Sequence, residues 1–434
     1  FLRPFPAFLS CILLGIPAIL VPALPAVFPS IAWKASGGNT PPHVLLVVLD
    51  SVPAASLGAY GHYRTTSPRL DILAGEGALF EKVWTSSTHP RQALEDLLGA
   101  SPASSLPRIL RRRGWATGAF LREGALLANP RGIARVDTLD RPPAAQRSKI
   151  PLALTRLWPE PPSPPEPCHG NQALLDLFLG WLDALPRQRP FFALLHLPGS
   201  RFPYSPLEED ETRFLPEGAS PSGLETLDQG PAVWEAMVAG EYKPGQGEID
   251  LRKALHDAAI RSTDATLGAL VEALREREIL DQTLLVITSL GGQEFGRNGR
   301  FGHGSSLGEN ALHVPFLVRH PASIYRRTRV GGSVSLARCS SGIQQILDHP
   351  GERALEEKAL EGLFGAGEIM VARSTSGDFA VSDGRHKLVL FADGSRALVD
   401  MHLDPEENAL GSRTVAERDA EKAILLESLL DSRD

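Results

Sequence analysis

Cysteine is scarce in this chain: its 434 residues contain three, Cys11, Cys168 and Cys339. The three form no CxxC pair and no spacing typical of metal ligands, so the sequence predicts no cysteine-based metal site. A disulfide between Cys168 and Cys339 would require an oxidising compartment, and the sequence alone leaves that pairing open.

The chain also lacks an excess of basic charge, since 44 lysines and arginines face 51 aspartates and glutamates, for a net charge of −7. It has no basic stripe and no alternation of aromatic with basic residues, so we expect no nucleic-acid partner. Hydrophobic residues make up 43% of the chain and charged residues 22%. This composition supports a sizeable core, and the length favours one large α/β domain with a small second unit.

Charge is absent from one long stretch near the N-terminus. No charged residue occurs from Pro4 to Trp33, and Arg3 and Lys34 flank this stretch. It is longer than the roughly 20 residues that a transmembrane helix needs, although prolines at 17, 22, 25 and 29 weaken a regular helix in its second half. A cleaved signal peptide is the alternative. Because no clear small-x-small cleavage site is present, we favour a membrane helix within 1–34.

This segment sets the expected location of the rest of the chain. A linker at 35–42 follows it, and the domain beyond is then expected on the extracytoplasmic side of the membrane, periplasmic or extracellular. The expected partners are the membrane itself and other subunits of a membrane complex.

Strand and helix patterns alternate after the linker. The run HVLLVVLD at 43–50 is apolar up to its aspartate, which is typical of a strand buried on both faces in a parallel sheet. The further predicted elements are helix and strand over 67–88 with a turn at Gly75 and Gly77, helix and strand over 106–121, a helix at 171–185, a strand at 189–197, a long helix at 250–280, and strands at 282–289 and 313–321. This order indicates an α/β domain over 43–350.

Two stretches interrupt the alternation. Residues 142–167 carry nine prolines, which indicates a surface insertion with polyproline character. Residues 205–250 are rich in Glu, Pro and Gly and are interpreted as a long lid-like loop.

The pattern changes over 351–434. Antiparallel strands are expected there, joined at Asp383–Gly384 and Asp393–Gly394, and a helix at 414–431 ends the chain. We interpret this region as a small C-terminal subdomain.

A glycine-rich loop, TSLGGQEFGRNGRFGHG at 288–304, follows the strand-like run at 284–287. A loop of this kind at a strand end is where α/β enzymes usually bind a metal or an anion. Its first turn, Leu290-Gly291-Gly292, offers no carboxylate, imidazole or thiol. The loop is therefore either part of an active site or the remains of one.

Four segments resemble the sulfatase family, within the alkaline phosphatase-like superfamily. They are HVLLVVLDSVPAASLGAYGHYRTTSPRLDILAGEGALFEKVW, RPFFALLHLPGSRFPY, HDAAIRSTDATLGALVEALREREILDQTLLVITS continuing into FGHGSSLGENALHVPFLVR, and SDGRHKLVLFADGSRALVDMHLDPEENAL. The resemblance implies a three-layer sandwich with a large, mostly parallel mixed sheet, plus a small C-terminal antiparallel sheet with a terminal helix.

The resemblance also implies metal-assisted chemistry on sulfate or phosphate esters. A divalent cation (calcium, zinc, manganese or magnesium) would polarise the ester, and a formylglycine, serine or threonine would attack it. Asp50 occupies the position of a metal-binding aspartate, whereas Ser51 stands where a second aspartate often follows. The alternative for Asp50 is a cap on the next helix, with Pro53 in its first turn.

The nucleophile position falls on Thr88. Thr88-His89-Pro90 matches the start of the family pattern, but Arg91 comes one place early and Gln92 stands where arginine is expected. Threonine cannot become formylglycine, because its oxidation would give a ketone. Thr88 is thus a candidate phosphate-type nucleophile, or else a turn or helix-cap residue.

The remaining family positions are altered. Leu290 and Gly291 replace the aspartate and histidine that would bind the metal, unless a loop shift recruits Glu294. Arg201 replaces a histidine; it is a candidate anion-binding residue or a surface arginine. His303 is kept, as a candidate anion contact or proton donor, or for loop packing.

Other histidine positions complete this comparison. Asn298 stands where histidine is common in the family, and four histidines are interpreted as structural: His43, His62, His196 and His313.

Three hypotheses follow. The first is a domain without catalysis, with no cofactor, that serves as a binding or scaffold subunit. The second is an active ester hydrolase or transferase that uses Thr88 and one divalent cation in an atypical site. The third is a metal-free anion pocket formed by Arg201, His303 and backbone N–H groups.

Overall fold

The computed structural model describes residues 41–99, 101–127, 131–139, 167–304, 306–348, 355–413, 415 and 420–431. The predicted membrane helix within 1–34 lies outside these residues, as do the linker up to residue 40 and all but the last residue of the insertion at 142–167. Within the described part of the chain, no helix is both long and apolar enough to span a bilayer.

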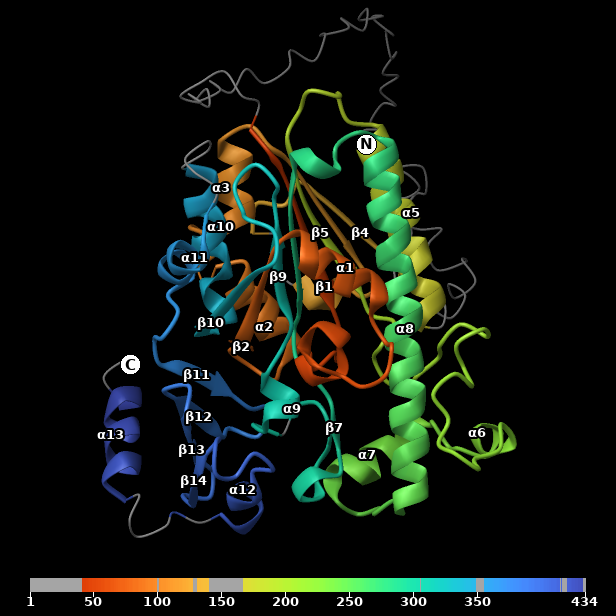
Figure 1. Ribbon diagram of the computed structural model, residues 1–434, viewed down its shortest axis with the longest axis vertical. Coiled ribbons are helices and arrows are strands. Elements are labelled where there is room, and N and C mark those ends of the chain that lie inside the picture. The colour runs from red at the N-terminus through yellow and green to blue at the C-terminus, as the bar shows by residue number, and fades with distance from the viewer. Residues whose placement is uncertain are drawn as a thin grey trace, which may run out of the picture.

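An eight-stranded sheet forms the centre of the molecule, with strand order β10-β2-β9-β6-β1-β5-β3-β4 (Figure 1). The strands are β1 (His43–Leu49), β2 (Ala78–Trp84), β3 (Ala116–Leu121), β4 (Arg135–Thr138), β5 (Phe191–Leu197), β6 (Thr283–Ser289), β9 (Phe316–Arg319) and β10 (Thr328–Ser335). Neighbours are parallel except at β9, which is antiparallel to both β2 and β6. The predicted large, mostly parallel mixed sheet is confirmed.

Helices cover both faces of this sheet and complete three layers (Figure 1). One face packs against α2 (Pro90–Leu97), α3 (Leu106–Arg112), α10 (Cys339–Asp348) and α11 (Glu357–Phe364), and the other against α1 (Pro68–Glu76), α5 (Pro167–Asp183) and α8 (Gln246–Glu276). The packing of strand β1 explains why its sequence is apolar. Its residues alternate between two hydrophobic cores: Val44, Leu46 and Val48 enter the first, while Leu45 and Val47 enter the second. A strand buried on both sides must be apolar throughout.

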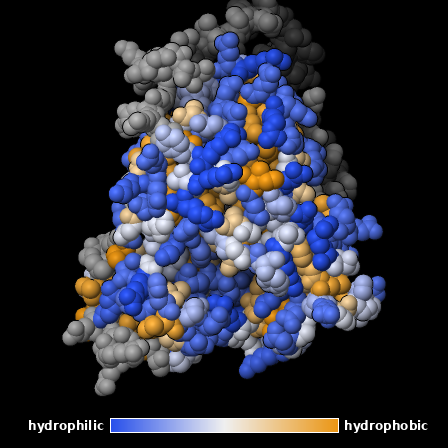
Figure 2. Space-filling model, in the orientation of Figure 1, coloured by the Kyte–Doolittle hydropathy of each residue, from blue (hydrophilic) through white to orange (hydrophobic). Residues whose placement is uncertain are grey.

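The C-terminal unit is a four-stranded antiparallel sheet, in the order β11-β12-β13-β14. Its strands are β11 (Met370–Arg373), β12 (Phe379–Ser382), β13 (His386–Leu390) and β14 (Arg396–Asp400), followed by the helices α12 (Asn408–Ser412) and α13 (Ala420–Asp431). The predicted turns at Asp383–Gly384 and Asp393–Gly394 join β12 to β13 and β13 to β14. On the face shown in Figure 2, hydrophobic side chains lie in separate small groups rather than in one broad patch.

The segment 205–250 differs from the prediction of one long loop. It contains α6 (Ser222–Glu225) and α7 (Pro231–Ala239), and α8 already begins at Gln246. Some of its proline and glycine residues lie at helix ends: Pro231 begins α7, and Gly240 follows its last residue in a left-handed conformation. Both residue types are common at helix ends as well as in loops, so composition alone did not separate the two.

The predicted turn at Gly75 and Gly77 begins later than expected, because α1 continues through Gly75 to Glu76. Gly77 is the residue that allows the chain to turn there. A Cβ atom at this position would lie 2.4 Å from the backbone oxygen of Val318 in β9, so only glycine permits the strands to approach.

The elements β10, α10 and α11 were not predicted. Strand β10 reads TRVGGSVS, and its two glycines and polar residues hide the strand pattern. Helix α11 places Leu360 and Phe364 in the first core of the large sheet. The beginning of the region 351–434 therefore contributes to the packing of the large sheet as well.

Candidate functional site

The site lies where the parallel strands β1, β5 and β6 end side by side. Leu49, the last residue of β1, is in register with Leu197 of β5 and Ser289 of β6. Because the carboxyl ends of parallel strands share one edge, the residues that follow each strand come together there.

Asp50 follows β1 and is 3% exposed. Its Oδ2 lies 3.5 Å from Nε2 of His196, the Ser51 hydroxyl donates to its Oδ1 at 3.2 Å, and the Ser200 hydroxyl donates to its backbone oxygen at 2.7 Å. The next helical turn follows Pro53 without a side-chain cap, so Asp50 does not cap it. The carboxylate instead faces the site.

The electrostatic surroundings of Asp50 are basic. Burial would raise the pKa of this carboxyl, but the close contact with His196 and the charges of His196, Arg201 and His303 outweigh it and hold the pKa well below its ordinary range. Burial lowers the pKa of His303, and the charge of Asp50 offsets this only in part. Asp50 is therefore ionised near neutral pH, with the Arg201 guanidinium and two imidazoles around it.

Leu290 takes the position where a second metal ligand is expected, and its side chain is 1% exposed and belongs to the first hydrophobic core. Its backbone is tied down as well: the N–H donates to Leu49 at 3.3 Å, and the carbonyl accepts from the Thr85 hydroxyl at 2.8 Å. Gly292 then holds the turn, since a Cβ there would lie 1.8 Å from the Asn310 backbone oxygen.

Glu294 is not drawn toward Asp50. It lies in the short strand β7 (Glu294–Phe295), is buried, and accepts a hydrogen bond from the Ser306 hydroxyl at 3.0 Å. Burial and then the charge of Glu407 raise the pKa of Glu294 to about 7. Its side chain therefore belongs to a buried cluster beside the C-terminal sheet.

The residues around Asp50 do not fit a divalent cation. Within the described residues, no three histidine, cysteine, aspartate or glutamate side chains gather as a metal site. A dication needs several oxygen or nitrogen donors, whereas Asp50 supplies a single carboxylate, and the positive charge of Arg201 that reaches it opposes a cation.

Thr88 is buried beside the same loop. Its hydroxyl donates to the backbone oxygen of Gly304, with the Arg373 oxygen also within 3.5 Å, and its N–H donates to Arg373 at 2.9 Å. The residue preceding α2 is His89, and no side chain caps that helix, so Thr88 is not its cap. A backbone carbonyl cannot act as a general base, and the contacts of Thr88 join the loop to β11.

The neighbours of Thr88 are directed to solvent. Arg91 pairs with Glu95 at 3.4 Å, and Gln92 donates to Asp96 at 2.9 Å. These side chains line a cavity of about 750 Å³ between α2 and β11. The family's arginine position is thus filled by an exposed amide held along α2.

Arg201 follows β5, and its half-exposed side chain lies 3.5 Å from Glu123. Its charge nevertheless reaches Asp50 and His303. Asn298 is directed elsewhere, since its amide donates to the Glu407 backbone oxygen at 2.9 Å. Of the predicted site residues, the structure therefore brings together Asp50, Arg201 and His303.

His196 was interpreted from the sequence as structural, yet it is the side chain that meets Asp50. It is in register with Val48 of β1, near the end of the neighbouring strand β5. A histidine near the end of a buried strand, next to a strand ending in aspartate, was the signal that would have found it. Cys339 is a free buried thiol, while the Cys168 side chain lies outside the described residues.

The layered mixed sheet, with a site at the ends of β1, β5 and β6, defines an alkaline phosphatase-like fold. The profile of the sulfatase family matches residues 42–337, and the chain belongs to this family. Human arylsulfatase A is 24% identical over 433 aligned residues, which cover 87% of this chain and 80% of that protein.

Two solved structures share the fold. A phosphonate monoester hydrolase of Agrobacterium radiobacter has a TM-score of 0.65 at 18% identity, covering 90% of this chain and 94% of that one. A protein solved in complex with its substrate D-glucosamine-2-N,6-O-disulfate has a TM-score of 0.66 at 15% identity, covering 91% and 97%.

Proposed function

We propose that this sulfatase-family domain has lost metal-dependent ester hydrolysis and serves as a binding or scaffold subunit. The observation that carries the proposal is the replacement of a metal-ligand set by Leu290, which packs in the core, and by basic side chains around Asp50. A buried carboxylate that is already paired gives little attraction for a cation and would lose its partners on binding one.

The altered site also lacks the means to activate a nucleophile. In a metal-assisted mechanism the cation polarises the ester and lowers the pKa of the attacking group. Thr88 donates its hydroxyl hydrogen to the Gly304 carbonyl, which cannot remove it. His303 and Arg201 are better suited to bind an anionic group than to transfer one.

The proposal places the domain outside the cytoplasm, held at the membrane by the uncharged segment within 1–34 and associated with other membrane subunits. It is supported by the length of that segment and by the proline-rich insertion at 142–167, a composition common in extended surface segments.

A second candidate is an active hydrolase of sulfate or phosphate esters. It is favoured by the similarity to arylsulfatase A and to a phosphonate monoester hydrolase, and by the contact of Thr88 with the residue that follows His303. This candidate requires a metal site that forms by a different loop arrangement.

Metal content and turnover distinguish the two candidates. The purified chain is incubated with calcium, zinc, manganese or magnesium, dialysed, and analysed for bound metal. Hydrolysis of 4-nitrophenyl sulfate and 4-nitrophenyl phosphate is measured for the wild type and for Thr88→Val under the same conditions. We expect well under one equivalent of metal and no turnover above that of the variant. One equivalent of metal, together with turnover that Thr88→Val abolishes, would overturn the proposal.

A further inference from the structure

The end of the large sheet opposite Asp50 is formed by the starts of its parallel strands (Figure 1). His43, the first residue of β1, is in register with Thr283, the first of β6, and the first residues of β5 and β3, Phe191 and Ala116, pair with each other beside β1. Strands β2 and β10 begin together and run in the same direction, because β9 is antiparallel to both β2 and β6. The loops that lead into these strands therefore meet at one end of the molecule.

Exposed arginines gather in these loops. They are Arg111 and Arg112 at the end of α3 before β3, Arg187 and Arg189 before β5, and Arg326 and Arg327 before β10. Among the described residues, none of the six has an ion-pair partner. Tyr325, which precedes the last pair, is 44% exposed. Arginines together with an exposed tyrosine are typical of a protein surface that meets lipid headgroups.

Most of the acidic side chains at this end are paired with other arginines. Asp183 pairs with Arg277 at 2.8 Å and Asp348 with Arg113 at 2.5 Å, while Arg319 pairs with both Glu76 and Asp281. Three further acids are exposed there: Glu276, Glu278 and Glu356. The six arginines outnumber them, so this end carries a positive excess in a chain whose net charge is −7.

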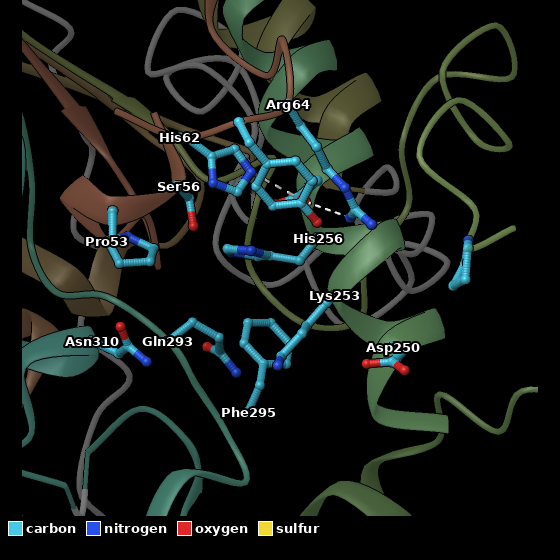
Figure 3. Close-up of a pocket in the computed structure, with 14 residues that line it drawn as sticks. Pro53, Ser56, His62, Arg64, Asp250, Lys253, His256, Gln293, Phe295 and Asn310 are labelled. Atoms are coloured by element: carbon cyan, nitrogen blue, oxygen red, sulfur yellow. Dashed lines mark hydrogen bonds and ion pairs between the residues drawn. The ribbon is translucent and has the colours of Figure 1, made fainter. Parts of the chain in front are cut away.

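The opposite end of α8 has balanced charges instead. Arg64 donates to Asp257 at 2.7 Å, and His62 lies 3.5 Å from the same carboxylate oxygen. Lys253 and Asp250 of α8 line a cavity with them and add one charge of each sign (Figure 3). A positive excess is therefore not a general property of the surface along this helix.

The order of the chain places the uncharged stretch Pro4–Trp33 next to the basic end. Lys34 precedes Pro41 by seven residues, and seven extended residues span at most about 25 Å. The Trp115 indole N–H donates to the Pro42 backbone oxygen at 3.1 Å, which fixes the entry to β1 beside the end of α3. A chain held in a bilayer through Pro4–Trp33 must therefore keep this end of the sheet close to the membrane surface.

We propose that the basic end of the sheet lies on the bilayer and that its arginines bind the phosphate groups of anionic lipids, with Tyr325 at the interface. The inference rests on the proposed membrane attachment and adds which face of the domain meets the lipid. Guanidinium groups pair well with phosphate, and each basic residue near an anionic bilayer strengthens binding about fivefold. Asp50 lies at the other end of the strands, so its site is directed away from the bilayer.

Hydrogen exchange of the full chain in nanodiscs tests this proposal. Discs of phosphatidylcholine alone are compared with discs that also contain phosphatidylglycerol. We expect the backbone amides of the loops at 111–115, 186–190 and 325–328 to exchange about tenfold or more slowly in the anionic discs, and high salt to remove the difference. Equal exchange in the two kinds of disc, or a difference that high salt leaves intact, would overturn the proposal.

Two charge-reversed variants make the test specific to this face. Arg111→Glu combined with Arg112→Glu should remove most of the lipid-dependent protection. Lys243→Glu combined with Lys253→Glu makes the same change of charge at exposed positions near the start of α8, and it should keep the protection. The proposal fails if the first variant is protected as the wild type is, or if the second loses protection equally.

Extraction of reconstituted vesicles with alkaline carbonate separates this inference from the proposed anchoring. A chain that resists extraction but shows no lipid-dependent protection refutes the basic face and leaves the anchoring in place. A chain that carbonate releases refutes the anchoring, and exchange of the free chain with each kind of disc added then decides whether the face binds anionic lipid.

Discussion

Two buried charge clusters of opposite composition lie along the glycine-rich loop at 288–304. At one, a single carboxylate, Asp50, is surrounded by the basic groups of His196, Arg201 and His303. At the other, a single ammonium, Lys387, is surrounded by carboxylates. The first stands where family members use a metal, and the second joins the large sheet to the C-terminal sheet.

The cluster around Lys387 is held together by the ion pairs of its ammonium group. Lys387 of β13 is fully buried; it donates to Glu309 of α9 (Glu309–Leu312) at 2.9 Å and to Glu407, which lies just before α12. Glu407 in turn accepts from the Glu309 backbone N–H at 2.8 Å. The comparison teaches that at each end of the loop the buried charge lies beside groups of opposite sign, and that at neither end do the described residues gather a donor set for a metal.

The largest effect is expected when Lys387 is replaced. Lys387→Met leaves Glu309 and Glu407 buried without their counter-charge, which should cost about 3–5 kcal/mol in the free energy of unfolding. Urea unfolding at pH 7 measures it. Arg385→Met, which removes an exposed arginine paired with Asp400 on the same sheet, is the control and should change little. A small loss for Lys387→Met would mean that the cluster does not join the two sheets.

Asp50→Asn should have the next largest effect, because it leaves the facing basic groups without their counter-charge. We expect a loss of about 2–3 kcal/mol in the free energy of unfolding at pH 7. The pKa of Asp50 is lowered in the folded state, so its contribution is fully present above its ordinary pKa of 3.8 and is lost as pH falls further. The difference between wild type and variant should therefore close in acid.

The matched control for this change is Asp183→Asn, which alters an exposed carboxylate paired with Arg277. A variant of Asp50 that is as stable as the wild type at pH 7 would contradict the proposed charge balance. A divalent cation that stabilises the wild type but not the Asp50 variant, and so widens the difference between them, would contradict it as well.

Glu294, in the cluster of Lys387, should make the stability of the chain depend on pH in the opposite direction to Asp50. Its folded pKa of about 7 lies above the ordinary value of 4.5, so the folded state holds the proton more tightly, and stability falls as pH rises from 4.5 through 7. Glu294→Gln should remove this dependence and stabilise the chain by about 1–2 kcal/mol at pH 8. Thermal unfolding at several pH values measures it, and parallel curves for wild type and variant would refute it.

The smallest effect is expected at Thr88. Thr88→Val removes one buried hydrogen bond, to Gly304, and should cost about 1 kcal/mol in the free energy of unfolding without altering ester turnover. Thr226→Val, an exposed threonine whose hydroxyl also donates to a backbone carbonyl, is the control and should cost less. Loss of a measurable hydrolytic rate in Thr88→Val alone would favour the active-enzyme candidate.

Much of the fold was predictable because burial leaves a clear pattern. The apolar run at 43–50 identified the central strand, and the turns at Asp383–Gly384 and Asp393–Gly394 identified the small sheet. Strand β10 was missed because two glycines weaken its pattern, and the strand forms through pairing with β2. Helix α7 was missed because Pro231 and Gly240 mark helix ends as well as loops.

The sequence alone gave the residue type at each position of the site, whereas it did not give the contacts that each side chain makes. Residue types alone showed that the side chains at Leu290 and Gly291 offer no ligand atom, because leucine carries only a hydrocarbon and glycine carries no side chain in any fold. Only the folded arrangement decided that Leu290 packs in the core, that His196 faces Asp50, and that Glu294 joins the cluster of Lys387. Those contacts join residues far apart in the sequence, and their geometry depends on strand register and on how the two sheets pack.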